Sequence, residues 1–348
     1  QGFLRYEGTL PLLEVKMSAP SVLIQNLETT IQEPLCHNEA VKNAINQGHN
    51  RLQTALTQLE PGHLLLTLHA EIIHQRLMEK ITAYNNVPTT PMEPRQLGEC
   101  LCAPYGKMLR GKIVPNTVTK TIHTDKVFSP DLLNHSVQAF PNYPPISCQI
   151  RSLKSFDRPV ILVDDLMHPG FRFAAIDPIL HEEEIDLRLI LVGVLSGHGR
   201  DLIEMRERLV DSVYFLPTLN RWFVESTLFP FFGGDTVERE HPHLSGMLSG
   251  INHVMPYESP PLAKECPPEA TAGFSRACLV STRQIIGVLE QEYRSLYARN
   301  LTLSRLAEAI ILPLCPDKGD CFTYDGSIAP STYLDNDLEL LERILPKN

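Results

Sequence analysis

The chain has 348 residues, a formal net charge of −10 and 43% hydrophobic residues. This hydrophobic share is typical of globular proteins and excludes collagen-like and disordered chains. The length suits two domains, or one large domain with additions, and is enough for a sizeable core without disulfides. The net acidity argues against a nucleic-acid partner, because a general nucleic-acid binder presents a basic face. The 28 prolines outnumber the 19 glycines, which predicts many fixed turns between regular elements.

No apolar run is long enough to cross a bilayer, so the sequence predicts no membrane partner. No signal peptide is visible at residues 2–16, where charged residues interrupt the apolar ones. The eight cysteines form no pair of CxxC motifs, and we expect free thiols in a cytoplasmic protein. The alternative is a metal or redox pair at Cys100 and Cys102, which would face the same side of a strand.

The first part of the chain combines strand and helix patterns. Residues 3–16 and 21–27 are apolar runs broken at prolines, which is typical of paired strands. Residues 38–59 carry apolar side chains at helical spacing, and Asn38 is placed to cap the first turn.

Strand and helix patterns alternate through the middle of the chain. Short apolar runs predict buried strands, and segments with helical spacing lie between them. This alternation predicts an α/β fold with a parallel sheet and helices on both faces. The predicted strands are residues 64–68, 97–103, 159–163, 187–195 and 212–216, and the predicted helices are residues 71–84, 172–181 and 199–209.

The last part of the chain differs from the middle. Residues 241–268 are rich in proline, glycine and histidine and show little periodicity. Helical spacing returns at residues 275–298, 302–310 and 335–345. We therefore expect an N-terminal extension at residues 1–60, an α/β domain at residues 61–235, and an irregular linker with a helical region at residues 236–348.

The most informative stretch runs Val160-Ile-Leu-Val-Asp-Asp-Leu-Met-His-Pro-Gly-Phe-Arg172. A buried strand meets two carboxylates, Asp164 and Asp165, which are followed by a glycine turn and a helix. In an open α/β sheet, ligands bind outside the carboxyl ends of the strands, and a helix N-terminus there favours anions. Carboxylates beside an anion site suggest a ligand with both hydroxyl and phosphate groups, such as a ribose 5-phosphate, with Mg²⁺ as its cofactor.

This stretch resembles the phosphoribosyl-diphosphate loop of the type I phosphoribosyltransferases. The family's pattern is four apolar residues, two acids, three variable residues, Thr or Ser, Gly, one residue, then Thr or Ser. Asp164, Asp165 and Gly170 match it, whereas Pro169 and Arg172 stand where the family has hydroxyl residues. Pro169 removes an N–H donor from the phosphate cradle, and a bidentate phosphate contact from Arg172 would offset this loss. The resemblance comprises this motif and the strand order of the middle of the chain.

The resemblance implies roles for particular residues. Asp164 and Asp165 would be the catalytic residues, gripping the ribose hydroxyls and holding Mg²⁺. Phosphate would be bound partly by the loop and partly by a basic segment upstream, Tyr105 to Lys126. The glycine-rich turn from Ser196 to Arg200 would line the same crevice. Trp222 and Phe223 would stack on a nitrogen base. The implied phosphate-binding residues are His168, Gly170, Phe171, Arg172, Arg110 and Lys120.

We therefore expect a phosphoribosyltransferase-like protein that binds phosphoribosyl diphosphate or a ribose phosphate and exchanges pyrophosphate for a nitrogen base. Such an enzyme is a glycosyltransferase, and its partner is a small phosphorylated ribose. The sequence is also compatible with a homo-oligomer. The alternative is a non-catalytic module that senses a nucleotide or phosphoribosyl diphosphate. Pro169 and Arg172 favour the module, whereas the retained acids and the basic segment favour the enzyme.

Three other interpretations have weaker support. Asp165 to Gly170 also resembles the phospho-acceptor segment of response-regulator receivers, but the upstream acids and downstream lysine of that family are missing. Alternatively, the acids only cap the next helix of an ordinary α/β domain, because carboxylates complement the helix dipole. His241, His243 and His253 lie close together in sequence but lack an evident fourth ligand for zinc. No GxSxG, HExxH or Walker A motif occurs.

Overall fold

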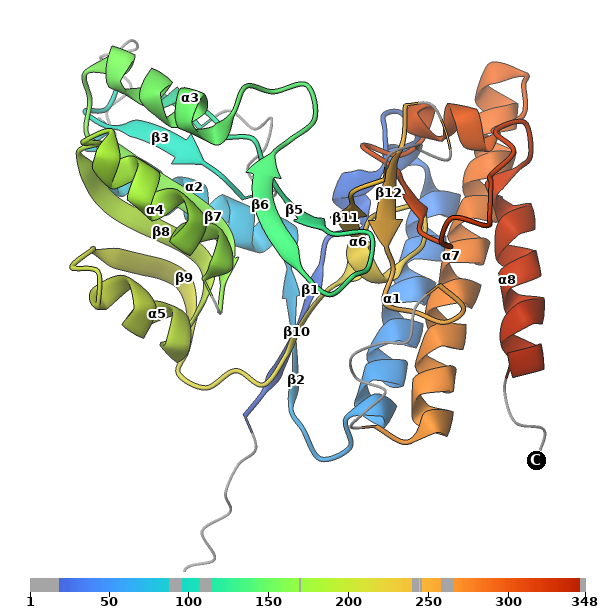
Figure 1. The fold of residues 1–348 in the computed structure, drawn as a ribbon. Helices are drawn as coiled ribbons and strands as arrows, with labels where there is room; N and C mark the ends of the chain where they lie inside the picture. Colours follow the sequence, from blue (N-terminus) through green and yellow to red (C-terminus); the bar gives the residue numbers. More distant parts are fainter. Residues whose placement is uncertain are drawn as a thin grey trace, which may run out of the picture.

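The computed structural model describes residues 19–87, 96–106, 114–168, 170–239, 244, 246–257 and 266–344. These residues form a mixed α/β structure with three sheets (Figure 1). The strands are β1 (Ser21–Gln25), β2 (Leu65–His69), β3 (Leu101–Pro104), β4 (Val118–Thr119), β5 (Thr124–Phe128), β6 (His135–Ala139), β7 (Val160–Met167), β8 (Leu187–Ser196), β9 (Val210–Leu216), β10 (Trp222–Val224), β11 (Asp235–Val237), β12 (Leu248–Ile251) and β13 (Leu314–Pro316). The α-helices are α1 (Glu39–Leu59), α2 (Ala70–Tyr84), α3 (Ile146–Arg151), α4 (Phe171–Glu182), α5 (Gly197–Glu204), α6 (Glu225–Leu228), α7 (Pro268–Tyr297) and α8 (Pro330–Ile344).

The first sheet is fully parallel and has the strand order β4-β3-β7-β8-β9. Its two faces belong to two hydrophobic cores, because successive side chains of a strand point to opposite sides. Ile161 and Val163 of β7 share a core with α2, whereas Val160 and Leu162 share a core with α3, α4 and α5. The prediction of a parallel sheet with helices on both faces is confirmed.

The strand order of this sheet reverses between β3 and β7. The chain adds β4 on the far side of β3, and later adds β8 and then β9 on the far side of β7. At such a reversal the connections leave in opposite directions, so a crevice opens outside the carboxyl ends of the two central strands. Gly106, just after β3, and the second half of β7 border this crevice.

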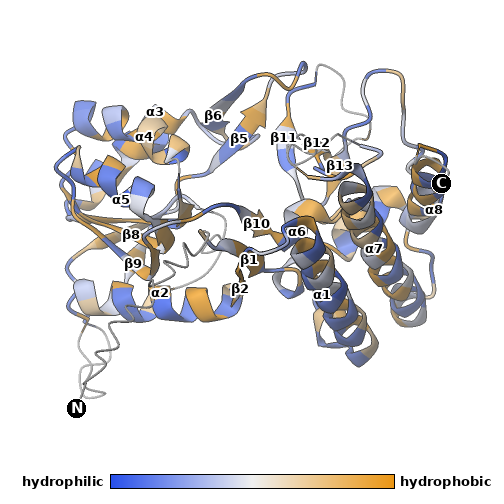
Figure 2. Ribbon diagram, turned by 90° about the horizontal axis from the view of Figure 1, so that it is seen from below, coloured by the Kyte–Doolittle hydropathy of each residue, from blue (hydrophilic) through white to orange (hydrophobic). Residues whose placement is uncertain are grey.

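A second parallel sheet, β10-β1-β2, lies between the α/β unit and a helical unit (Figure 1). All five residues of β1 are buried. Val22 and Ile24 belong to the core that contains α2, whereas Leu23 belongs to the core that contains α1 and α7. In Figure 2 these central strands are mostly hydrophobic, whereas α1, α2 and α7 carry both hydrophobic and hydrophilic residues. The small sheet is therefore a wall shared by two cores.

The helical unit joins segments from both ends of the described chain. Helix α1 packs along α7, and α8 packs on α7. The predicted cap of α1 is confirmed, since the Asn38 side chain accepts hydrogen bonds from the N–H groups of Ala40 (2.8 Å) and Val41 (3.2 Å). Asn38 also donates to the Glu292 carboxylate on α7 at 2.7 Å. Asn38 thus stabilises the N-terminus of α1 and also joins it to α7.

The third sheet, β13-β12-β11-β5-β6, connects the two units. Strands β5 and β6 form an antiparallel hairpin, and β5 pairs in parallel with β11. This hairpin does not follow from the sequence pattern, because its strands are half-polar and its partner β11 lies far away in sequence. Strand β6 leaves most of its residues partly or fully exposed, as edge strands do.

Several predicted elements differ in extent from the observed ones. Strand β7 continues to Met167, so the acidic pair lies inside the strand and not beyond its end. Helix α5 ends at Glu204, earlier than predicted, and Leu303–Glu308 forms a 3-10 helix where an α-helix was expected. The predicted strand at residues 3–16 lies outside the described residues.

All eight cysteines are free thiols, as predicted. Burial raises the pKa of the Cys102 thiol to about 12, which keeps it protonated at neutral pH. None of the helices in the described part of the chain combines the length and apolar character that crossing a bilayer requires.

Candidate functional site in the crevice between β3 and β7

The two acids of β7 differ in burial, and the alternation of side chains along the strand breaks at them, because Val163 and Leu166 pack against the same core. Asp164 faces the α4 side and is only 3% exposed. Asp165 is partly exposed and lies against the end of β3, where a Cβ atom added to Gly106 would come within 2.4 Å of its Oδ1 atom. Glycine at position 106 therefore leaves the room in which the Asp165 carboxylate sits.

Asp164 forms an ion pair with Arg172, the second residue of α4, with an Nη1–Oδ1 distance of 2.7 Å. The Arg172 guanidinium also lies over the fully buried Tyr105 ring, 5.9 Å from its centroid. Burial raises the pKa of Asp164, although the charge of Arg172 acts in the opposite direction. Burial by itself lowers the pKa of Arg172, but the negative charges of Asp164 and Asp165 outweigh this effect and raise the pKa. Arg172 thus stays cationic at the start of α4.

The N-terminus of α4 opens toward the same crevice and has no side-chain cap. Its N-cap residue is Gly170, whose φ of +69° lies in the left-handed region that favours glycine. A Cβ atom at Gly170 would also come within 2.3 Å of Leu202. The first N–H groups of a helix have no partner within the helix, and together with the helix dipole they attract anions. Gly170, Phe171 and Arg172 thus lie at an uncapped helix start, where the motif predicts phosphate binding; Pro169 lies outside the described residues.

His168 connects this loop to two other parts of the chain. Its Nδ1 atom lies 2.8 Å from the Ser196 hydroxyl, which also accepts the N–H of Gly199 at 3.0 Å and caps α5. Its ring meets the ring of Trp222 edge to face, with centroids 5.4 Å apart, and the His198 ring lies 6.0 Å away. Burial, followed by the charge of His198, lowers the pKa of His168. The predicted loop, the glycine-rich turn and one predicted base-binding residue therefore lie together.

The β5–β6 hairpin reaches the start of α4, which the sequence did not predict. The His135 ring packs edge-on against Phe171 at 5.2 Å and lies tilted against the Phe128 ring at 5.4 Å. Lys126 lies over the Phe128 ring, 4.4 Å from its centroid, and pairs with Asp235 at 3.4 Å. The hairpin thus places a lysine and a histidine near the predicted phosphate loop. No spacing in this polar segment could have indicated the contact.

The remaining predicted site residues differ in their exposure. Phe223 is 7% exposed and belongs to the core around α1 and α7, so its ring cannot stack on a ligand and the base-binding assignment is restricted to Trp222. Trp222 is 38% exposed. Lys120 is exposed at the edge of the sheet, beyond β3, where its N–H donates to the Cys102 carbonyl at 2.9 Å. Arg110 lies outside the described residues.

Metal binding has limited support from the side chains in place. Among the described residues, no group of three or more His, Cys, Asp and Glu side chains could hold a metal ion. Mg²⁺ needs fewer protein ligands, because it retains waters and binds through one or two carboxylates together with substrate phosphates. The partly exposed Asp165 fits this requirement better than the buried Asp164.

No known protein family and no curated protein matches this chain in sequence comparisons. Its function is therefore inferred from the geometry of the crevice.

Proposed function

We propose that the crevice between β3 and β7 binds a phosphorylated ribose, with phosphoribosyl diphosphate as the candidate ligand. The observation that carries the proposal is the uncapped start of α4, with Arg172 beside it, at the strand-order reversal next to Asp165. Helix N–H groups and a guanidinium suit a phosphate, and a carboxylate suits the hydroxyls of a sugar. The motif resemblance at Asp164, Asp165 and Gly170 points to the same ligand.

In this proposal the 5-phosphate lies on the first turn of α4, at Phe171 and Arg172. Asp165 accepts hydrogen bonds from the ribose hydroxyls and contributes one oxygen ligand to Mg²⁺, which would neutralise part of the diphosphate charge. Lys126 and His135 of the hairpin approach the same helix start and supply further donors for phosphate oxygens. The half-exposed Trp222 ring offers the apolar face on which a nitrogen base would stack.

The second candidate, a sensing module that binds the ligand without transferring it, is supported by the Asp164–Arg172 ion pair. A pair of catalytic carboxylates must both face the sugar, yet Asp164 is buried and engaged by Arg172. Ligand binding through Asp165 and the N–H groups at the start of α4 leaves the Asp164–Arg172 ion pair undisturbed. Transfer requires Arg172 to leave Asp164 for a phosphate and the carboxylate to be exposed.

Calorimetric titration with phosphoribosyl diphosphate and Mg²⁺ tests the proposal. Wild-type protein is expected to bind, and Asp165→Asn to lose most of the affinity. Asp201→Asn, which removes the same charge from the exposed surface of α5, is the matched control and should bind like the wild type. Absence of binding at millimolar ligand would refute the proposal. Release of pyrophosphate in the presence of a panel of nitrogen bases identifies a transferase, and binding without release identifies a sensor.

A further inference from the structure

The small sheet β10-β1-β2 has its own strand-order reversal. Its first strand, β1, lies in the middle, with β2 added on one side and β10 on the other. Since all three strands are parallel, their carboxyl ends meet at one edge. By the rule that places ligands outside the carboxyl ends at such a reversal, the expected site lies where β1 and β10 end.

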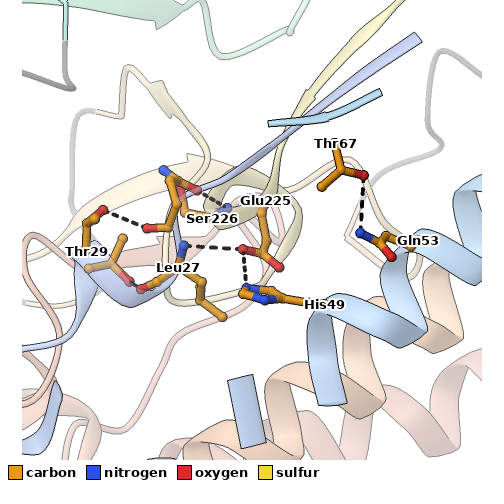
Figure 3. A network of polar contacts seen from close by, with 9 residues as sticks. Leu27, Thr29, His49, Gln53, Thr67, Glu225 and Ser226 are labelled. Carbon is orange, nitrogen blue, oxygen red and sulfur yellow. Dashed lines mark hydrogen bonds and ion pairs between the residues drawn. The ribbon is translucent and has the colours of Figure 1, made fainter. Parts of the chain in front are cut away.

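A polar network crosses this reversal (Figure 3). Asn26, after β1, accepts the N–H of Ser226 at 3.0 Å and donates to the Ser226 hydroxyl at 2.9 Å. The Glu225 carboxylate, at the end of β10, accepts the N–H of Leu27 at 3.3 Å. These side-chain hydrogen bonds hold the segments that follow β1 and β10 together, beyond the point where the strands pair.

Glu225 is also the partner of His49 from α1, with 3.0 Å between Oε2 and Nε2. Glu225 is fully buried, and His49 is 8% exposed. The second carboxylate oxygen of Glu225, Oε1, is buried and has no hydrogen-bond partner among the described residues. A buried carboxylate with an unmatched oxygen is costly, and such groups are concentrated at functional sites.

A cavity of about 340 Å³ lies at this edge of the sheet, and His49 forms part of its wall. The volume is within the range of small-ligand sites and has room for about ten water molecules. Gln25 and Asn26 from the end of β1 contribute amides to the lining, and His69, at the end of β2, contributes an imidazole. The cavity therefore lies at the ends of β1 and β2 and the start of α2, and no residue of β10 lines it.

The charges that line the cavity select the class of ligand. Two carboxylates, Glu28 and Glu71, stand at exposed positions of the lining, and the described lining residues include no lysine or arginine. Phosphate-type anions would meet only negative charge here, in contrast to the crevice at Arg172. Carboxylates and amide oxygens are instead acceptors for ammonium or guanidinium groups.

We propose that this cavity binds a small organic cation, an aliphatic amine or guanidine of about ten non-hydrogen atoms, as sized by the cavity volume. The cationic group is held by Glu28 and Glu71, and the amide of Gln25 contacts the polar end of the ligand. His49, paired with Glu225 behind it, forms part of the cavity wall. This site lies on a different sheet from the phosphorylated-ribose crevice and does not depend on the function proposed there.

Titration with three probes that share a six-carbon chain tests the charge selectivity. 1,6-Diaminohexane is expected to bind with one-to-one stoichiometry, 1,6-hexanediol at least ten-fold more weakly, and adipate not measurably. The double variant Glu28→Gln/Glu71→Gln should weaken diamine binding by roughly three- to ten-fold, as expected for two partly solvated ion pairs. Both positions are exposed, so the variant should keep the wild-type melting temperature.

The matched control is Glu39→Gln/Glu269→Gln, which removes the same charge from the first turns of α1 and α7, outside the cavity. It should bind the diamine like the wild type. The proposal is overturned if the diamine does not bind at millimolar concentration, if the diol binds as tightly, or if the control variant weakens binding as much as the cavity variant. Binding of phosphoribosyl diphosphate should be the same in both variants, which separates this test from that of the crevice.

Discussion

The imidazole of His168 and the indole of Trp222 meet edge to face, with ring centroids 5.4 Å apart. One ring belongs to the loop before α4, and the other belongs to β10 of the small sheet. Trp222 is the single tryptophan of the chain, so all tryptophan emission of the protein comes from the ring that makes this contact.

The first prediction concerns the pH dependence of this fluorescence. Burial and the charge of His198 hold the pKa of His168 below its ordinary value of 6.5. Because a protonated imidazole quenches an adjacent indole, the emission of Trp222 should fall as the pH falls, with a midpoint below 6.5. His168→Gln should abolish the transition, and His198→Gln should move it upward. A midpoint at or above 6.5 in the wild type would contradict the prediction.

The same pKa shift has a consequence for stability. Between its lowered folded pKa and its ordinary value, His168 binds more protons in the unfolded than in the folded chain, so stability falls as the pH falls through this range. The contribution is fully present above pH 6.5. Urea unfolding of wild type and His168→Gln at several pH values should show a smaller loss of stability toward acid in the variant.

The second prediction separates the two acids of β7. Asp164→Asn leaves Arg172 without its charged partner and should lower the free energy of unfolding by about 3 kcal/mol, near the low end for broken buried pairs because Arg172 is partly exposed. Asp165→Asn should change it by less than about 1 kcal/mol, as a partly exposed position does, yet impair ribose-phosphate binding. Urea denaturation and calorimetry measure the two effects. Equal destabilisation by both variants would argue against the different burial and pairing of the two carboxylates.

The third prediction uses three glycines with different surroundings. A Cβ atom at Gly106 would lie 2.4 Å from the Asp165 Oδ1 atom, whereas one at Gly199 would lie 2.5 Å from the backbone oxygen of Met167. A carboxylate can rotate away and a backbone cannot. Gly106→Ala should therefore weaken ligand binding with little loss of stability, and Gly199→Ala should cost about 1–3 kcal/mol in thermal or urea unfolding.

Gly273 supplies the control for these substitutions. It lies in α7 with nothing within 4 Å of an added Cβ atom. Gly273→Ala should therefore stabilise the protein by about 0.5–1 kcal/mol through the better helix propensity of alanine. If all three alanine variants behaved alike, the steric interpretation would be untenable.

The fourth prediction tests the cap of α1. Asn38→Ala removes the acceptor for two N–H groups and the hydrogen bond to Glu292, and should cost about 1–2 kcal/mol of unfolding free energy. Asn38→Ser keeps a capping oxygen and should recover part of the loss. Asn50→Ala, at an exposed position in the interior of the same helix, should be neutral or slightly stabilising. A cost at Asn50 equal to that at Asn38 would indicate that capping is not the cause.

Local features of the sequence predicted much of the fold. The cap at Asn38 and the apolar spacing after it involve only near neighbours along the chain, and they gave α1 within one residue. The buried run at Val160 likewise gave the start of β7. The end of β7 could not be read in this way, because the strand extends to Met167 through pairing with the long strand β8. That extension places both carboxylates inside the strand, with Asp164 buried and Asp165 partly exposed.

The candidate sites depend more strongly on distant partners. The loop from His168 to Arg172 was identified from its residues, but its contacts with Trp222 and with His135 of the hairpin follow from strand pairing. The pair of His49 and Glu225 has no sequence signal, since one residue lies on a helix face and the other follows a three-residue strand. Only the order of the small sheet brings them together.

Strand β1 sends Leu23 into one core and Val22 and Ile24 into the other. Moving this strand by one residue against its neighbours would exchange the side chains that the two cores receive. Both units therefore favour the same register of β1, and a shift of this register would disrupt both cores. Correct folding of the α/β unit and of the helical unit therefore depends on the register of the same five-residue strand.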